Sequence, residues 1–362
     1  MTLPLLSVCI PNFNHARYLP CAIRSLLSQS LLPDEIIIVD DASSDNSVQV
    51  IEKLAREHPR IKLIRNPVNQ GCNRSINIAL AQACGKYVFA LAADDYVLPG
   101  CFEKIVAQME QHPDAGACLT WLQGVDPDGN VLSQRDLPNY HSHETHVHIR
   151  TPTFLSPARV LRRLKRQAWF VNGGPMVFRR EVLLEMGGYN VQLGYAADGF
   201  CSYFAALKYG LVYIPEKLIA FRQIRGSSGD AGSRNPETAS QVHKRSLALM
   251  REDRFRTVFP EPFIRQMEKQ VAYGTFRGLF VKERQEFRRS LEMLMPASSA
   301  VAKLLWGLFK TLGILQQCTL KVYCMNNYRA LYRDNEGVRD NTKTRSAEGL
   351  ADGAASVKTS RT

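Results

Sequence analysis

The sequence predicts an α/β protein built on a doubly wound, mainly parallel sheet. Short apolar runs alternate with segments of helical spacing over the first hundred of the 362 residues. One run, EIIIV at residues 35–39, is continuously apolar and rich in β-branched side chains, which is typical of a strand buried on both faces. An i, i+3, i+4, i+7, i+8 helical pattern is formed by Leu19, Ala22, Ile23, Leu26 and Leu27. This β-α-β-α-β-α-β succession predicts parallel strands with helices on both faces.

The individual elements follow from the same patterns. In chain order we expect strand 5–10, helix 19–27, strand 35–39, a helix that Ser44 or Asp45 caps, strand 61–65, a helix that Gly85 closes, and strand 86–91. Beyond Leu98 the pattern weakens. There we expect a helix near 101–111, strands at 115–121 and 174–178, and a helix near 198–208.

The C-terminal third differs in composition from the rest. Residues 231–333 have helical spacing and many charges, and the polar residues 334–362 are expected to be disordered. Seventeen basic and eight acidic residues lie between Lys244 and Asp334, which accounts for nine of the twelve excess positive charges. An anionic membrane surface or a nucleic acid could explain such basicity, but no nucleic-acid recognition motif is present.

Several protein classes are disfavoured. The nine cysteines are scattered, with no CxxC pair, which indicates a reducing compartment. We see neither a signal peptide nor a run of about 18 apolar residues, so a cytoplasmic location is expected. A GxGxxG after the first strand and a GxxxxGK[ST] are both absent from the sequence, which disfavours dinucleotide-dependent redox chemistry and P-loop phosphoryl transfer.

Two acidic pairs follow two of the predicted strands. Asp40-Asp41 ends the strand at 35–39, and Asp94-Asp95 follows the strand at 86–91. Ligands of open parallel sheets bind beyond the carboxyl ends of the strands. Carboxylates there can hold Mg²⁺ or Mn²⁺ together with substrate phosphates. The alternative is that both pairs only cap helices or form turns.

Five segments occur in the order found in a known family. They are Ser7–Ser47, Asn66–Leu80, Gly85–Gly100, Phe178–Tyr189 and Ala197–Gly210. Together, over about residues 4–225, they resemble the inverting family 2 glycosyltransferases with the GT-A fold that build bacterial polysaccharide and lipopolysaccharide. The resemblance implies a nucleotide-sugar-binding half at 1–97 and an acceptor-binding half at 98–230, and the basic helical extension at 231–333 and the tail at 334–362 follow them.

The resemblance also implies a role for individual residues on the donor side. Pro11 and Phe13 would wall the nucleotide base and Asp41 would hydrogen-bond it, while Arg74 would supply a basic contact to the nucleotide. Asp94 resembles the acid that contacts the ribose, and Asp95 the metal ligand of the family's DXD motif. Ala92 stands where many members have a further acid.

A catalytic base, a cofactor and substrates are implied in the same way. Asp198 occupies the place of the catalytic base; the alternative is a helix N-cap. The resemblance implies Mn²⁺ or Mg²⁺ as cofactor and a nucleoside-diphosphate sugar, of the UDP or dTDP kind, as donor. It implies hexosyl or N-acetylhexosaminyl transfer to a saccharide or lipid-linked acceptor.

Other features of the acceptor half have two interpretations. Gly187-Gly188-Tyr189 predicts a tight turn before an acceptor-side loop. Trp169, Asn172 and Gly174 could line an acceptor pocket, although Trp169 could equally be a core aromatic. The histidines at 141, 143, 146 and 148 could bind a metal or form an exposed loop.

The basic C-terminal part contains an apolar stripe. Its members, with lysines on the flank, are Val301, Leu305, Leu308, Leu312 and Leu315. Such a helix could lie on an anionic membrane surface, or it could pack on the catalytic domain or a partner subunit.

Two rival functions compete with transfer. A nucleotide-sugar nucleotidyltransferase would need a glycine-rich loop after the first strand, and residues 11–17 contain no glycine. A catalytically degenerate scaffold is the second rival, because Ala92 and Ala197 stand where acids are common in the family.

Overall fold

The computed structural model describes residues 5–133, 149–166, 176–224 and 236–271. The chain forms two compact units, Met1–Met267 and Glu268–Thr362, and the fold below is that of the first. In the described residues, no helix is both long enough and apolar enough to cross a bilayer. The segment with Trp169, Asn172 and Gly174, the four-histidine segment, the stripe at 301–315 and the tail at 334–362 lie outside the described residues.

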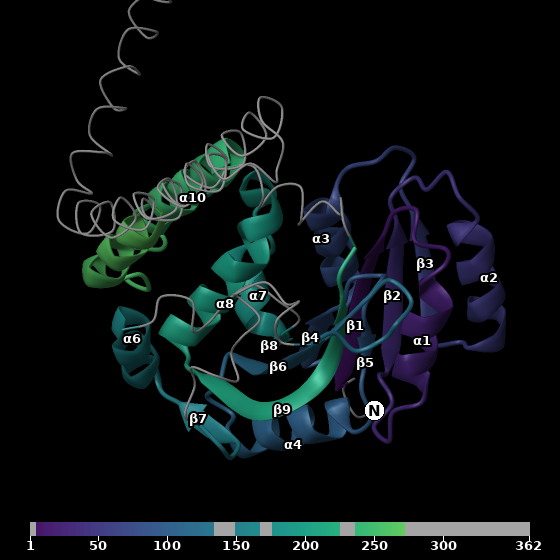
Figure 1. Ribbon diagram of the computed structural model, residues 1–362, viewed down its shortest axis with the longest axis horizontal. Helices are drawn as coiled ribbons and strands as arrows, with labels where there is room; N and C mark the ends of the chain where they lie inside the picture. Colours follow the sequence, from purple (N-terminus) through teal and green to yellow (C-terminus); the bar gives the residue numbers. More distant parts are fainter. Residues whose placement is uncertain (1–4, 134–148, 167–175, 225–235, 272–362) are drawn as a thin grey trace, which may run out of the picture. The chain divides into compact units, whose positions relative to one another are not determined.

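The first half of this unit, residues 5–97, contains the predicted parallel strands. The elements are β1 (Leu6–Asn12), α1 (Leu19–Leu27), β2 (Glu35–Asp40), α2 (Ser47–Glu57), β3 (Ile61–Arg65), α3 (Cys72–Gln82), β4 (Tyr87–Ala90) and the short β5 (Tyr96–Val97). The first four strands lie in the order β3-β2-β1-β4, all parallel (Figure 1). All six residues of β2 are buried, as its apolar run predicts. The α/β prediction is therefore confirmed.

The second half, residues 98–224, completes the sheet mainly with antiparallel neighbours. Its elements are α4 (Cys101–Gln111), β6 (Ala117–Val125), β7 (Thr153–Leu155), α6 (Pro157–Arg166), β8 (Val177–Arg179), α7 (Arg180–Met186), the 3₁₀ helix η2 (Val191–Ala196), α8 (Ala197–Lys208) and β9 (Leu211–Arg222). β8 lies antiparallel between β4 and β6. β9 runs parallel to β6, with β5 and β7 antiparallel to it.

The longest of these strands, β9, is the main element that the sequence patterns miss. Its twelve residues appear as a long curved ribbon in Figure 1. Pro215, Glu216 and Lys217 interrupt its apolar pattern, and the register with β6 shifts at Trp121. A proline and two charged residues within a short apolar run are typical of a loop. The sequence does not reveal that an irregular strand tolerates them here.

Gly85 has a different role from the predicted one. Helix α3 ends at Gln82, and Ala83 caps it in an extended conformation, so Gly85 does not close the helix. A Cβ on Gly85 would lie only 2.6 Å from the backbone nitrogen of Ser7, whose hydroxyl accepts a 2.8 Å hydrogen bond from the Gly85 amide. Glycine is needed here because two backbone segments approach closely.

Neither predicted candidate is the N-cap of α2: Asn46 occupies that position, and its side chain makes no capping hydrogen bond. The carboxylate of Asp45 accepts a 2.9 Å hydrogen bond from the amide of Ser47, the first residue of α2. Its other oxygen accepts from the amide of Ala16, which lies in the loop after β1. Asp45 therefore ties the start of α2 to the neighbouring loop from the position before the N-cap, and the prediction that Ser44 or Asp45 caps the helix is wrong.

Residues 236–263 pack onto the part of the first unit that carries the sheet. Helix α10 (Pro236–Met250) lies against η2. An aromatic cluster joins α8 to the residues that follow α10; its members are Phe200, Tyr203, Phe204, Phe255, Phe259 and Phe263. The first part of the predicted basic extension at 231–333 thus belongs to the same compact unit as the sheet.

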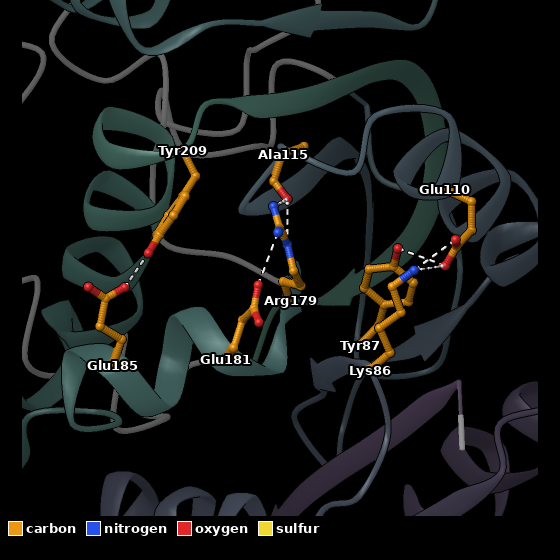
Figure 2. A network of polar contacts seen from close by, with 8 residues as sticks. All are labelled: Lys86, Tyr87, Glu110, Ala115, Arg179, Glu181, Glu185 and Tyr209. Atoms are coloured by element: carbon orange, nitrogen blue, oxygen red, sulfur yellow. Dashed lines mark hydrogen bonds and ion pairs between the residues drawn. The ribbon is translucent and has the colours of Figure 1, made fainter. Parts of the chain in front are cut away.

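At the beginning of β4, polar contacts hold the junction between the two halves (Figure 2). Lys86 and Tyr87 both contact the carboxylate of Glu110 on α4. Arg179, at the end of β8, donates two hydrogen bonds to the carbonyl oxygen of Ala115 and pairs with Glu181. These contacts involve the opposite end of β4 from Asp94 and Asp95, so we assign them to the architecture.

Candidate active site

The acids after β2 organise the loop that leads to α3. Oδ1 of Asp41 accepts from the side chain of Asn66 at 2.7 Å and from the amide of Gln70 at 2.9 Å, and Oδ2 accepts from the amide of Gly71 at 2.7 Å. Burial alone would raise the pKa of Asp41, but these hydrogen bonds outweigh it and hold the pKa below its ordinary value. Asp41 is thus an ionised, buried acid at the start of α3.

Asp94 and Asp95, the acids after β4, form a pair whose negative charge the surrounding protein does not fully compensate. Burial raises the pKa of Asp94, and burial together with the charge of Asp94 raises the pKa of Asp95 well above the ordinary value. His15 places its Nδ1 atom 3.8 Å from Oδ1 of Asp94. Two adjacent carboxylates in the interior are costly unless a positive charge joins them.

This pair fits a divalent cation shared with a substrate. Oδ1 of Asp95 accepts a 2.8 Å hydrogen bond from the amide of Arg222, which orients the carboxylate and leaves the second oxygen for a ligand. No three His, Cys, Asp or Glu residues are grouped so as to hold a metal by themselves within the described ranges. Mg²⁺ commonly takes only one or two carboxylates and completes its shell with phosphate oxygens and water.

Arg222 is a residue of this site that the sequence analysis did not select. Its Nε donates to the carbonyl oxygen of Asp94 at 2.8 Å, and its Nη1 donates to the carbonyl oxygens of Asp126 and Pro127 at 3.2 and 2.9 Å. The guanidinium also lies over the rings of Tyr18 and Tyr96, 4.9 and 5.6 Å from their centroids. Because β9 was not predicted, no sequence signal placed its last residue beside the acids.

Asp198 lies in the first turn of α8. The N-cap is Ala196, whose side chain makes no capping hydrogen bond, so the predicted alternative of an N-cap aspartate does not describe this position. Oδ1 of Asp198 accepts from the amide of Gly199. Burial raises the pKa of this half-buried carboxyl to about 6. A carboxylate with such a pKa can accept a proton near neutral pH.

Three of the predicted acids lie near enough to the thiol of Cys72 to act on it electrostatically. Cys72 is the first residue of α3; its side chain reaches solvent but is closely surrounded by protein. Burial raises its pKa to about 12, and the negative charges of Asp198, Asp41 and Asp94 add to this effect in that order. Acids from the ends of β2 and β4 and from α8 therefore lie in the neighbourhood of one side chain, and Asp95 adjoins Asp94 in the sequence.

The remaining predicted residues are placed as follows. Pro11 is half-buried in β1, opposite Val39 of β2. Phe13 follows with 44% of its surface exposed, and Arg74 is exposed near the start of α3. Their contacts to a nucleotide stay predictions, as do those of Trp169, Asn172 and Gly174. The sequence analysis missed His15 and Cys72, which become noticeable only through their proximity to the acids.

Comparison with known proteins agrees with this fold. The family model for glycosyl transferase family 2 matches residues 7–187. The chain is 32% identical over 131 residues to the chondroitin synthase of Pasteurella multocida, which is 36% of this chain and 14% of that protein. Curated relatives such as this one are much longer, so the chain corresponds to only a small part of them.

Two solved structures resemble the whole fold. The S. aureus TarS 1-349 complex with UDP-GlcNAc has a TM-score of 0.56 at 17% identity, covering 90% of this chain and 92% of the other. The mannosyltransferase PcManGT from Pyrobaculum calidifontis, in complex with GDP-Man and Mn²⁺, has a TM-score of 0.54 at 18% identity, covering 90% and 86%. At such identities the likeness establishes the GT-A type of fold alone.

Proposed function

The chain belongs to glycosyl transferase family 2, and from this premise we propose that it is an inverting glycosyltransferase. It moves a sugar from a nucleoside-diphosphate sugar to a saccharide or lipid-linked acceptor. The observation that supports the proposal is that Asp41, Asp94 and Asp198 all lie near enough to Cys72 for their charges to act on its thiol. A doubly wound sheet places ligands at this edge, and here the edge carries acids suited to a metal and to proton transfer.

The donor is proposed from the site and from structural neighbours. TarS has been seen with UDP and UDP-GlcNAc, and PcManGT with GDP-Man. We propose a UDP- or dTDP-sugar carrying a hexose or N-acetylhexosamine. Asp41 and Asp94 would contact base and ribose, between the walls formed by Pro11 and Phe13, and Arg74 would approach the phosphates.

Asp95 is the proposed ligand of Mn²⁺ or Mg²⁺. Its Oδ1 atom is already held by Arg222, so a cation would meet a preoriented carboxylate. When bound, the cation supplies positive charge that stabilises the departing diphosphate. It would also compensate the negative charge of the Asp94-Asp95 pair, whose pKa values are raised by burial.

Asp198 is the proposed general base. The acceptor hydroxyl oxygen attacks the anomeric carbon from the face opposite the diphosphate, and the bond from that carbon to the diphosphate oxygen breaks with its electron pair. Asp198 takes the hydroxyl proton as the new glycosidic bond forms. The anomeric configuration inverts because the attack comes from the face opposite the leaving diphosphate. Its raised pKa suits this role, because a base near the working pH both stays ionised and accepts a proton readily.

The proposed cellular place is the inner face of the cell membrane. It rests on the basic composition of the C-terminal part and on the sequence stripe at 301–315.

Matched asparagine variants test the assignment of the two acids. In a screen of nucleotide-sugar donors, we expect Asp198→Asn to lower transfer by about 10²–10⁴-fold while donor binding is kept. Asp95→Asn should weaken the thermal stabilisation that UDP or dTDP gives in the presence of Mn²⁺. Asp114→Asn is the control, because Asp114 is an exposed carboxylate on the loop after α4.

Two results would contradict the proposal. Near wild-type turnover in Asp198→Asn would remove Asp198 as the base. An absence of any metal-dependent stabilisation by nucleotides in the wild-type protein would favour a scaffold instead of an enzyme.

A further inference from the structure

One face of α3 holds the segment that leads into Asp198. Asn77 meets the backbone of Tyr189 twice: its Oδ1 accepts from the Tyr189 amide at 2.7 Å, and its Nδ2 donates to the Tyr189 carbonyl at 2.8 Å. One turn earlier on the same helix, Nδ2 of Asn73 donates to the carbonyl oxygen of Gly194 at 2.8 Å. The two asparagines, four residues apart, therefore grip both ends of the segment 189–194.

The segment is shaped to receive these contacts. Gly187 and Gly188 both have positive φ, as the predicted tight turn requires. A Cβ on Gly188 would lie 2.5 Å from Oδ1 of Asn77, so any larger residue would push the asparagine away. The close approach of Asn77 to this turn is thus built into both partners.

Tyr189 connects this grip to the base. Its ring is buried, and its pKa is raised well above the ordinary value by burial, then by Cys201 and Asp198. Asp198 is therefore near the side chain of the residue whose backbone Asn77 holds. Asp198 follows Gly194 by four residues, through the last turn of η2 and the start of α8.

The N-terminal end of the same helix, next to Asn73, is also attached to the donor-side acids. The amides of Gln70 and Gly71, just before α3, donate to Asp41, and Cys72 begins the helix among the three acids. Both sets of hydrogen bonds lie on the N-terminal half of one helix, so this half fixes the position of the segment 189–194 relative to Asp41.

From these contacts we propose that α3 is the strut that positions the base, and that Asn77 and Asn73 are its positioning residues. The inference rests on the proposed function of Asp198. Neither asparagine touches the reacting atoms; each acts by holding the backbone that carries Asp198 relative to the donor acids. Helix α10 also packs against η2, so the test must separate the contribution of α3 from that support.

Kinetics of Asn77→Ala test the strut. Because a shift of about 1 Å in a catalytic group can cost about 10²-fold, we expect the transfer kcat to fall by roughly 10²-fold while the KM for the donor stays within about threefold. Asn77→Asp keeps the acceptor for the Tyr189 amide but loses the donor to the Tyr189 carbonyl. Its kcat should therefore lie between those of wild type and Asn77→Ala. Asn73→Ala, which removes one hydrogen bond, should lower kcat by roughly 3–10-fold.

The matched control is Gln82→Ala, an exposed residue at the end of the same helix, which should leave kcat and KM unchanged. Thermal unfolding of every variant reports whether the fold is kept. If Asn77→Ala does not fold, the milder Asn73→Ala and Asn77→Asp decide the question by the same kcat and KM split.

Two outcomes overturn the strut. One is a folded Asn77→Ala with a kcat within twofold of wild type; the other is a loss confined to donor KM, which would assign α3 to the donor pocket. Failure of the proposed function gives a different result: the Asp198→Asn variant would transfer sugar at the wild-type rate. The two failures are therefore distinguishable in one set of assays.

Discussion

The two halves of the sheet differ in how far along the chain their contacts reach. In residues 5–97, β1 pairs with β2 and β2 with β3, each the next strand in the sequence, β4 pairs with β1, and the intervening helices pack nearby. In residues 98–224, β9 pairs with β6, β7 and β5, and Asn77 reaches Tyr189 across 112 positions. Local periodicity thus determines the first half, whereas long-range contacts assemble the second.

The proposed site combines both kinds of placement. Asp41 and Asp94 stand where strands end, so their position follows from the strand pattern. Asp198 and Arg222 reach the same place only after the second half has folded against the first. A substitution that removes a buried contact between distant residues should therefore affect the site more strongly than one that removes an exposed contact.

Arg222→Met should have the largest effect on stability of the three changes discussed next. It removes the charge beside Asp94 and Asp95 and leaves the carbonyl oxygens of Asp94, Asp126 and Pro127 without this donor. We expect a loss of about 3–5 kcal/mol in the free energy of unfolding, measured by denaturant titration, and a fall of at least about 10²-fold in transfer.

A second arginine provides the control for this prediction. Arg17 pairs with Asp128, which lies in the turn that contains Asp126 and Pro127, but both side chains are mostly exposed. Arg17→Met should cost less than about 1 kcal/mol, because exposed ion pairs contribute little. Equal losses of unfolding free energy in Arg222→Met and Arg17→Met would show that the burial of the Arg222 contacts does not determine their contribution to stability.

The second effect is a pH dependence that sets activity against stability at Asp198. With a pKa raised from 3.8 to about 6, the carboxyl is an ionised base only above that pH, so kcat/KM should fall about tenfold per pH unit below it. Protonation favours the folded state here, and that contribution is lost as the pH rises through about 6.

Asp198→Asn should therefore be inactive yet more stable than wild type above pH 6, with a Tm higher by roughly 2–5 °C. Below about pH 4 the difference should vanish, because Asp198 is then protonated in both the folded and the unfolded protein. A Tm advantage that is independent of pH would contradict the charge-burial origin of the shift.

The smallest effect concerns the thiol of Cys72. Removing the charge of Asp198 should lower the pKa of Cys72 and raise its thiolate fraction at a given pH. We expect alkylation of Cys72, followed by peptide mass spectrometry, to be roughly 2–5-fold faster in Asp198→Asn than in wild type. Alkylation of the exposed Cys84 serves as the internal reference. An unchanged ratio would place Asp198 away from the other acids.

The success of the sequence interpretation divides along the same line as the fold. The strands at 5–10, 35–39, 61–65 and 86–91 were predicted within a few residues, and so were the helices between them. β9 and the role of Gly85 were missed, because the first depends on irregular pairing with β6 and the second on the approach of Ser7. For the same reason Arg222 and Asn77 gave no signal: a residue type reveals nothing about a partner more than a hundred positions away.

By itself, the sequence determined the parallel α/β core and the presence of acids at the ends of two strands. Alternating apolar periodicity encodes both, since burial acts on each strand and helix where it stands. Only the tertiary structure decided which acids lie near one another, which backbone amides orient them and which helix holds the segment before Asp198. Hydrogen bonding and charge depend on distances of a few ångströms, and these exist only once distant segments of the chain have packed together.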